Sequence, residues 1–327
     1  MNFVYVLSCS NSDYYYEQFL LSVTSLRFFN PNANIFLLID EKTNHILNDR
    51  KQIYEPIISK TEIISTPVEY SQKEASRWIK TSIHHYVSGS YLFIDCDTVI
   101  TQELIPDFSQ DVHIGAVLDT HVTLDRHHLK ENFQKEDKKA GFSSSLNSNV
   151  RFNGGLIYYS GDTKAQEYFE KWHSLWIEGR NKGCSQDMPS LNQANFDMGN
   201  IITELDGTWN CQISHNGLPY LNEAKIIHYY ATSLVSFTPA YIPASIDTLK
   251  SIKNTGSISP NVLKLLENPK SAFSKESRII ADDASLDIID SAYFSKLLWL
   301  KRKHSKTFYF LNNIISNVKN PINKRPN

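Results

Sequence analysis

The chain carries a fully apolar run that ends in two acids. Residues 91–94 are Tyr, Leu, Phe and Ile, and Asp95, Cys96 and Asp97 follow directly. A strand without polar and apolar alternation is typical of a parallel sheet that is buried on both faces. Ligands of such sheets bind beyond the carboxyl ends of the strands. The run therefore predicts an α/β fold with a ligand site at the acids.

The spacing of the two acids suits a divalent cation. Side chains two residues apart on an extended segment point the same way, so Asp95 and Asp97 can share one ion. Carboxylate oxygens suit Mg²⁺ or Mn²⁺, which keep open positions for substrate phosphates. This pattern indicates phosphate-ester chemistry with a nucleotide as leaving group. The alternative is that the two acids only cap a turn after the strand.

Strand and helix patterns alternate along the first half of the chain. Apolar runs predict strands at 3–7, 35–39 and 61–65, and helical periodicity predicts helices at 16–28, 44–53 and 73–87. Each strand is followed by a crossover helix, which favours a parallel sheet. Further strands are predicted at 113–117 and 156–159. The polar stretch 129–149 between them predicts a long loop, either a functional lid or a surface insertion.

Composition and charge exclude several classes of protein. The chain has 327 residues, 41% of them hydrophobic, and a formal net charge of −2, which argues against general nucleic-acid binding. The cysteines are widely spaced, which predicts reduced thiols in a cytosolic setting; they are Cys9, Cys96, Cys184 and Cys211. No signal peptide and no membrane-spanning run is recognised.

The C-terminal tail differs from the rest of the chain. Residues 291–327 contain eight basic residues and no acid, so this segment carries +8 and the remainder −10. Aromatic residues, among them Trp299, Phe308 and Tyr309, lie between the basic ones. This composition suits an anionic membrane surface. The alternative is a basic helix that packs on the domain and frays at its end.

Several further landmarks occur in a fixed order along residues 3–230. They are the loop Asn11 to Tyr14, Ser25-Leu26-Arg27, Lys80, the acids Asp95 and Asp97, Phe152-Asn153-Gly154-Gly155, Asp187 with Leu191-Asn192, and His228. The ordered set resembles glycosyltransferases of the GT-A fold, specifically the retaining family 8 that includes glycogenin and bacterial lipopolysaccharide galactosyltransferases. The resemblance implies a Rossmann-like, mostly parallel sheet flanked by helices, here with a helical basic extension.

The resemblance also implies roles for individual residues. Asp95, Asp97 and His228 would hold Mn²⁺ or Mg²⁺, and Asp187 would be the catalytic carboxylate. A larger set would contact the nucleotide sugar: Leu7, Ser8, Asn11, Asp13, Tyr14, Arg77, Lys80, Cys96, Asn153, Gly154 and Gly155. The two glycines indicate either positive φ or a close approach of the backbone, with the donor sugar as the expected neighbour.

The sequence departs from the family pattern at two places. The family has Asp-Gln in its catalytic segment, whereas this chain reads Gln186-Asp187-Met188. The family's Gly and Lys-Pro-Trp segment after the histidine is absent here. Phosphate stabilisation therefore depends more on the metal and Lys80. Asp187 would orient the donor or stabilise an oxocarbenium-like centre, or would act as the base in an inverting reaction, and the sequence does not choose between these roles.

The function indicated is transfer of a hexose from a UDP-sugar to a glycan or lipid-linked glycan, as in bacterial surface polysaccharide synthesis. We expect a catalytic domain at 1–245 and a helical extension at 246–327. The expected location is the cytoplasm, with peripheral attachment to the inner membrane face through 291–327. Two alternatives are a nucleotidyltransferase or other metal-dependent phosphoester enzyme, and a non-catalytic nucleotide-sugar-binding protein.

Overall fold

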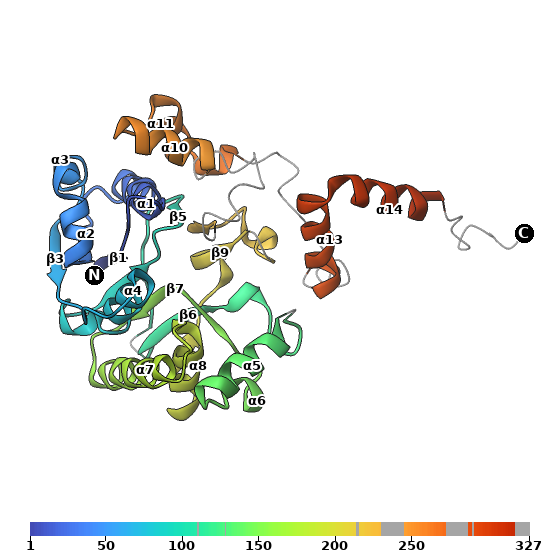
Figure 1. The fold of residues 1–327 in the computed structure, drawn as a ribbon, viewed down its shortest axis with the longest axis horizontal. Helices are drawn as coiled ribbons and strands as arrows, with labels where there is room; N and C mark the ends of the chain where they lie inside the picture. Colours follow the sequence, from blue (N-terminus) through green and yellow to red (C-terminus); the bar gives the residue numbers. More distant parts are fainter. Residues whose placement is uncertain are drawn as a thin grey trace, which may run out of the picture.

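A seven-stranded sheet forms the centre of the molecule (Figure 1). The computed structural model describes residues 1–109, 111–127, 129–213, 216–229, 245–272, 287–289 and 291–317. In sheet order the strands are β3 Lys60–Ile64, β2 Asn34–Asp40, β1 Asn2–Leu7, β4 Tyr91–Ile94, β7 Phe152–Tyr159, β6 Ile114–Leu118 and β8 Ile202–Glu204.

The strand directions confirm a mostly parallel sheet. β1 pairs in parallel with β2 and β4, β2 with β3, and β6 with β8. The exception is β7, which runs antiparallel to both β4 and β6. A smaller sheet contains β5 Thr98–Ile100, β10 Ile226–His228 and β9 Cys211–Gln212. The chain passes from the large sheet to the small one directly after β4, through the two acids.

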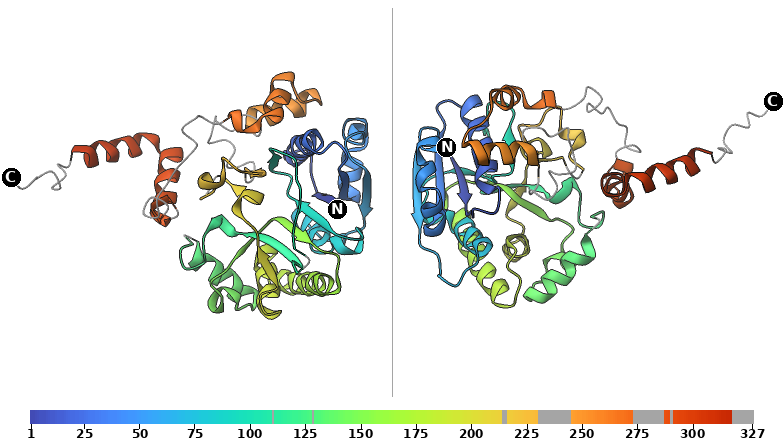
Figure 2. Two further views of the ribbon diagram at one scale, coloured as in Figure 1. Left: turned by 180° about the vertical axis from the view of Figure 1, so that it is seen from behind. Right: turned by 45° about the horizontal axis from the view of Figure 1, so that its top comes forward.

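Helices cover both faces of the large sheet (Figures 1 and 2). The α-helices are α1 Tyr15–Phe29, α2 Glu41–Ile46, α3 Lys51–Tyr54, α4 Gln72–Thr81, α5 Lys130–Ala140, α6 Ser144–Asn147, α7 Thr163–Asn181, α8 Asp187–Asp197, α10 Ile246–Thr255, α11 Pro260–Glu267, α13 Ala292–Lys303 and α14 Ser305–Asn317. Short 3₁₀ turns are η1 Asn48–Arg50, η2 Ile83–His85, η3 Asp119–His121, η4 Gly207–Asn210, η5 Leu218–Tyr220 and η7 Pro269–Ala272.

Alternate residues of β1 belong to two separate hydrophobic cores. Tyr5 and Leu7 pack with α1 on one face, and Val4 and Val6 pack with α4 and α7 on the other. A strand buried on both faces explains why its sequence shows no polar alternation. Apolar residues of α10 and α11, such as Leu249, belong to the same core as α1. The first part of the expected extension 246–327 therefore packs onto the body.

Two predicted helices are shorter than expected. The segment 44–53 is divided among α2, η1 and α3. α2 already begins at Glu41, because Asp40 caps it and accepts from the Thr43 N–H at 2.8 Å. The helix predicted at 73–87 ends at Thr81. The Thr81 hydroxyl donates to the Arg77 carbonyl at 2.9 Å, and such local bonds compete with helix continuation.

The prediction of a loop at 129–149 is wrong, because the segment folds into α5 and α6. Apart from Ala140 and Phe142, its buried residues are polar. Asp137 is fully buried and accepts hydrogen bonds from the Ser144 hydroxyl at 3.0 Å and the Ser145 N–H at 3.1 Å. The Arg151 guanidinium lies 3.8 Å from the Phe133 ring centroid. A few buried polar contacts, with only Ala140 and Phe142 in the apolar core, thus replace the regular apolar stripe on which a sequence-based prediction depends.

Candidate functional site

The two acids lie in the turn that joins β4 to β5. The Asp95 N–H donates to the Gly155 carbonyl on β7 at 2.9 Å, and the Thr98 hydroxyl donates to the Asp95 carbonyl at the same distance. The carboxylates stay accessible, with 33% of the Asp95 side chain and 19% of the Asp97 side chain exposed. The backbone of the turn is therefore fixed by the sheet while its two carboxylates face the site.

Strand pairing brings His228 to these acids from far along the chain. His228 is the last residue of β10 and lies opposite Thr98 of β5 in the antiparallel register. Its Nε2 is 3.2 Å from Oδ1 of Asp97, and the next N–H, of Tyr229, donates to the Asp97 carbonyl at 2.9 Å. One ligand atom from each of Asp95, Asp97 and His228 lies within 4.8 Å of the others.

A chain of amides orients the His228 ring. Its Nδ1 lies 2.9 Å from Oδ1 of Asn210, which in turn donates through Nδ2 to Oδ1 of Asn153 at 3.0 Å. Because an amide oxygen only accepts, Nδ1 carries a proton, and Nε2 is the ring atom that faces the acids. Burial lowers the pKa of His228, but the carboxylates of Asp97 and Asp95 outweigh it and raise the pKa above its ordinary value.

A buried ion-pair cluster lies beside the acids. The ammonium of Lys80, on α4, is 2.7 Å from Oδ2 of Asp187 and 3.6 Å from Oδ1 of Asp95. Nε of Arg77, one turn earlier on α4, is 3.5 Å from Oδ1 of Asp187. Asp187 is the first residue of α8. Burial raises the pKa of Asp187, but Lys80 and Arg77 outweigh it and hold the pKa well below its usual range.

Gly154 and Gly155 lie inside β7 rather than in a turn, and neither has positive φ. Their expected close approach is real, and its partners are side chains. A Cβ on Gly155 would lie 2.3 Å from Cε1 of His228, and one on Gly154 would lie 3.2 Å from Nζ of Lys80. Asn153 donates to Asp119 at 2.9 Å and accepts from the Gly155 N–H at 2.8 Å. Because these two positions of β7 have no side chains, His228 has room beside Gly155 and Lys80 has room beside Gly154.

The loop after β1, predicted to hold the nucleotide, is ordered by hydrogen bonds. Oδ2 of Asp13 accepts from the Ser10 N–H and from Nε2 of Gln72, both at 2.7 Å. Ser8 donates to Asp40 at 2.5 Å, and its carbonyl accepts from Gln72 at 2.8 Å. Leu7 is buried, whereas Asn11 is exposed. The Ser8 and Asp13 side chains therefore shape this loop from within.

Two further predicted residues have partners inside the protein. The Cys96 thiol donates to the Val6 carbonyl at 3.4 Å, so it faces β1, and burial raises its pKa. The ring of Tyr14 lies 4.8 Å from the ammonium of Lys253 on α10, which also donates to the Asp13 carbonyl. α10 therefore fixes the loop from outside the expected catalytic domain.

Sequence reasoning missed the residues that hold others in place, chiefly Asn210, Gln72 and Lys253. Asn210 is fully buried in η4 and Gln72 is the first residue of α4. Neither lies in a motif, because each acts through a partner that is distant in the sequence. Tyr15 was also missed. Burial raises the pKa of its hydroxyl, and its N–H donates to Oδ1 of Asp13 at 3.1 Å.

The mostly parallel sheet, with acids following its central strand, is the arrangement of the GT-A fold. The chain belongs to glycosyl transferase family 8, whose profile matches residues 6–233. It is thus a glycosyltransferase that uses a nucleotide-sugar donor. No curated protein matches the chain in sequence.

Three solved structures are similar to this chain at low sequence identity, and the first of them supports the fold. The galactosyltransferase LgtC, crystallised with donor and acceptor sugar analogues, is 12% identical with a TM-score of 0.51, and the match covers 80% of this chain and 98% of LgtC. Mouse xyloside xylosyltransferase 1 in its apo form is 14% identical with a TM-score of 0.46, over 69% of this chain and 96% of its own. GlyE of Streptococcus pneumoniae is 17% identical with a TM-score of 0.46, and the match covers 77% of this chain and 63% of GlyE.

Proposed function

We propose that this protein transfers a hexose from a UDP-sugar to a glycan or lipid-linked glycan, with Mn²⁺ or Mg²⁺ held by Asp95, Asp97 and His228. The observation that carries the proposal is the convergence of these three side chains, within 4.8 Å, at the end of the central strand. Family membership supplies the reaction class. The proposed donor, acceptor and metal follow from the chemistry of the residues.

The residues present fit a divalent cation. Two carboxylates and one imidazole form a mixed oxygen and nitrogen set, and Asn210 fixes the tautomer that such a ligand needs. With His228 neutral, the three carboxylates of Asp95, Asp97 and Asp187 exceed the two cations Lys80 and Arg77 by one negative charge. A divalent ion would make this cluster net positive and suited to a diphosphate. When bound, it would supply Lewis-acid stabilisation of the leaving UDP.

The protein's own residues would bind and orient the donor. The loop with Leu7, Ser8, Asn11, Asp13 and Tyr14 would hold the uridine. Lys80 and Arg77, together with Asn153, Gly154 and Gly155, would face the sugar and the diphosphate. Cys96 would contribute only its backbone, because its thiol faces β1. Lys80 is buried and already pairs with two carboxylates, so it can support leaving-group charge without reorganising.

Asp187 is better suited to orienting the donor than to removing a proton. Both of its oxygens face cations, at 2.7 Å for Lys80 and 3.5 Å for Arg77, and its pKa is lowered further from neutrality. A general base works best with a pKa near the working pH. We therefore assign Asp187 to orientation of the sugar and stabilisation of positive charge at the reacting carbon. This role fits a retaining reaction.

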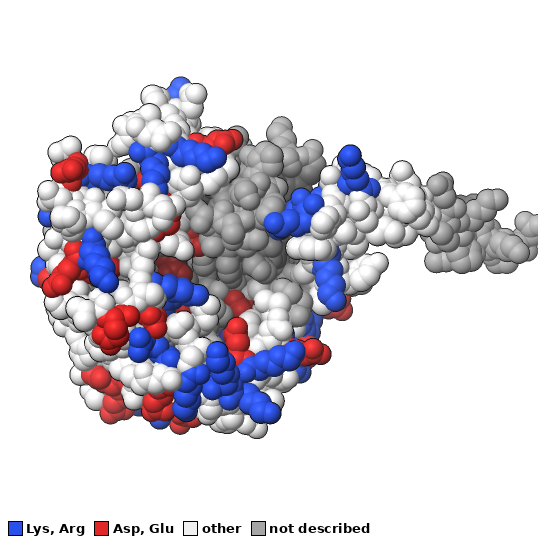
Figure 3. All heavy atoms as spheres, viewed as in Figure 1, with Lys and Arg blue, Asp and Glu red and all other residues white. Residues whose placement is uncertain are grey.

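The C-terminal helices suit a membrane-borne acceptor, as in bacterial surface polysaccharide synthesis at the inner face of the cytoplasmic membrane. α13 and α14 extend away from the body in each view, with Lys and Arg side chains on α13 and a single lysine near the start of α14 (Figures 1, 2 and 3). Large apolar side chains are exposed between the charges, including Trp299 at 55% and Phe310 at 64%. Among the described residues, no helix combines the length and apolar character that a membrane span requires. Lys319, Lys324 and Arg325 lie outside the described residues.

Vesicle sedimentation tests the membrane proposal. Each near-surface cation is worth about 1 kcal/mol, so the variant Lys301→Glu/Arg302→Glu/Lys303→Glu should bind anionic vesicles at least about 100-fold more weakly. The matched control reverses three exposed lysines of the body, Lys135→Glu/Lys138→Glu/Lys164→Glu, and should bind as the wild type does. Equal binding by both variants would contradict the assignment to α13.

A UDP-release assay across a panel of UDP-sugars, with and without Mn²⁺, tests the transferase proposal. We expect metal-dependent release from one donor, lost in Asp95→Asn/Asp97→Asn and kept in a control that changes two exposed acids, Asp49→Asn/Asp107→Asn. Release of pyrophosphate would point to a nucleotidyltransferase. UDP binding by calorimetry without turnover of any donor would point to a non-catalytic binding protein.

A further inference from the structure

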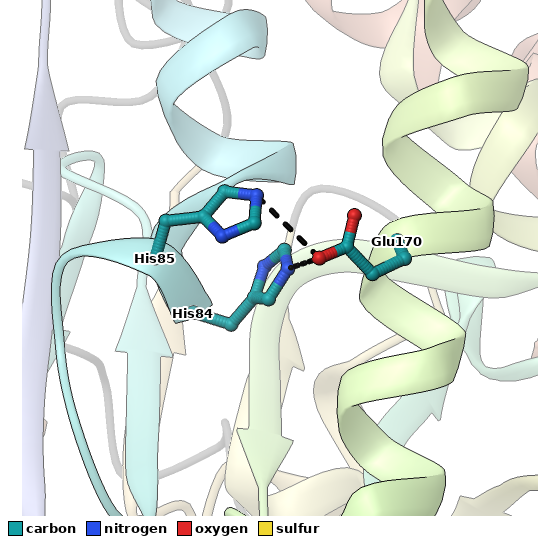
Figure 4. A group of neighbouring side chains, drawn as sticks. All are labelled: His84, His85 and Glu170. Carbon is teal, nitrogen blue, oxygen red and sulfur yellow. Dashed lines mark hydrogen bonds and ion pairs between the residues drawn. The ribbon is translucent and has the colours of Figure 1, made fainter.

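A second cluster of metal-ligating side chains lies away from the candidate active site. Among the described residues, two groups of three His, Cys, Asp or Glu side chains have ligand atoms within 4.8 Å of one another. One is the group of Asp95, Asp97 and His228. The other contains His84 and His85 of η2 and Glu170 of α7 (Figure 4).

The cluster lies near the amino end of β4, whereas the acids lie at its carboxyl end. α4 runs from the end of β3 back to the start of β4, so η2 directly after it lies near the amino end of β4. The ring of His84 is 5.5 Å from that of Phe169, which in turn is 6.0 Å from that of Tyr91, the first residue of β4. Asp95 directly follows the other end of β4. Because a strand rises about 3.3 Å per residue, the length of this four-residue strand lies between the cluster and the acids.

The geometry of the cluster matches a transition-metal site. Nε2 of His84 and Nε2 of His85 lie 3.1 and 3.7 Å from the same oxygen, Oε1 of Glu170 (Figure 4). Metal–ligand bonds of about 2.0–2.1 Å in a tetrahedron separate neighbouring ligand atoms by about 3.3 Å. The two observed separations lie on either side of this value. A small shift of exposed side chains would therefore bring the three atoms around one ion.

The surroundings hold the ligands ready. Only 1% of the His84 side chain is exposed, and its Nδ1 has no hydrogen-bond partner, so Nε2 provides the ring's polar contact. His173 lies one turn beyond Glu170 on α7, and its Nδ1 is hydrogen-bonded to the Thr81 hydroxyl at 2.7 Å. Burial lowers the pKa of His173 to about 4, so it adds no positive charge that would oppose a cation.

We propose that His84, His85 and Glu170 form a second site for a divalent transition metal such as Zn²⁺, distinct from the candidate catalytic site and bridging η2 to α7. Two imidazoles and one carboxylate are a ligand set typical of Zn²⁺ and its neighbours rather than of Mg²⁺. The side chains of His85 and Glu170 are 46% and 51% exposed, which leaves room for water on the ion. Because α4 carries Lys80, a bound ion would brace the helix that supports the active site.

Calorimetry with Zn²⁺ alone tests this inference on the full chain without an affinity tag. The background variant Asp95→Asn/Asp97→Asn removes the carboxylates of the other cluster, so the outcome does not depend on the proposed function. We expect this background to bind one Zn²⁺ per chain. In it, His85→Ala and Glu170→Gln should each weaken binding at least tenfold, since even changes around a metal ligand cost about 10- to 100-fold.

A matched control separates this site from weak surface binding. His45 is an exposed histidine on α2, and His45→Ala in the same background should bind Zn²⁺ as the background does. Thermal unfolding without metal checks that each variant folds, and visible absorption of bound Co²⁺ should fall in His85→Ala. The inference is overturned if the background binds no Zn²⁺, or if His85→Ala and Glu170→Gln bind it as tightly as His45→Ala.

Discussion

The sharpest test of the site geometry is the addition of one methyl group, in Gly155→Ala. The new Cβ would lie 2.3 Å from Cε1 of His228, 2.8 Å from its Nδ1 and 2.9 Å from Oδ1 of Asn153. Non-bonded carbons prefer about 3.5–4.0 Å, so the imidazole must retreat by more than about 1 Å. The ring is buried and held by Asn210, which leaves it no free direction.

The expected cost is much larger for activity than for stability. Overpacking of this kind costs about 1–3 kcal/mol in unfolding free energy, which a chain of this size can tolerate. A displacement of about 1 Å at a catalytic centre costs about 100-fold in turnover. Because the displaced group is a proposed metal ligand, the Mn²⁺ concentration for half-maximal activity should rise as well. UDP release over a Mn²⁺ titration, with thermal unfolding of the same samples, measures all three quantities.

Two other glycines of the same sheet provide a matched control and an intermediate case. In Gly115→Ala the new Cβ would meet only the flexible end of Leu205, at 2.9 Å, so stability should fall while activity and Mn²⁺ dependence stay at the wild-type level. In Gly154→Ala it would lie 3.2 Å from Nζ of Lys80, and an intermediate loss of activity is expected. A folded Gly155→Ala protein with wild-type turnover and wild-type Mn²⁺ dependence would refute the placement of His228 in the site.

Three further predictions follow from the contacts around Asp187 and His228. Asp187→Asn should lower turnover by about 100- to 1,000-fold while UDP affinity by calorimetry stays nearly unchanged, and near wild-type turnover would remove Asp187 from the chemistry. Asn210→Ala should weaken Mn²⁺ binding by about 10- to 100-fold because His228 loses its orienting partner. Asn222 is exposed, and Asn222→Ala should leave Mn²⁺ binding unchanged. Equal Mn²⁺ affinities of the two variants would show that the Asn210 amide is dispensable. Since the folded-state pKa of Asp187 is depressed, its stabilisation is complete above the unfolded value of about 3.9 and is lost as the pH falls through the folded value. The stability advantage of wild type over Asp187→Asn in urea unfolding should therefore shrink as the pH falls below about 4, and an advantage that does not change with pH would contradict the ion pairs with Lys80 and Arg77.

The parts of the fold predicted correctly from the sequence are those fixed by local pattern. β1, β2, β3 and β4 and helix α1 coincide with their predicted ranges to within one or two residues, because apolar runs and helical periodicity are properties of adjacent residues. The position of the acids at the end of β4 follows for the same reason. The helices α5 and α6 were missed because their buried anchor is Asp137, a polar residue whose partners lie in the next helix.

The assembly of the site depends on pairing between distant segments. His228 reaches Asp97 only because β10 pairs with β5, and nothing near His228 in the sequence specifies that register. The prediction of His228 as a metal ligand depended on the family resemblance. The buried amide of Asn210 carries no sequence signal, because its meaning lies in two hydrogen bonds to residues 18 and 57 positions away.

The glycine pair explains how one strand serves two parts of the site. Successive residues of β7 face opposite sides, so Gly154 faces Lys80 and Asp187 while Gly155 faces His228. The carbonyl of Gly155 also accepts from the Asp95 N–H, which ties the acidic turn to the same point. A side chain at either position would push one charged group away from the others. The absence of side chains at positions 154 and 155 of β7 is therefore what allows the charge cluster and the proposed metal ligands to meet at a single point of the sheet.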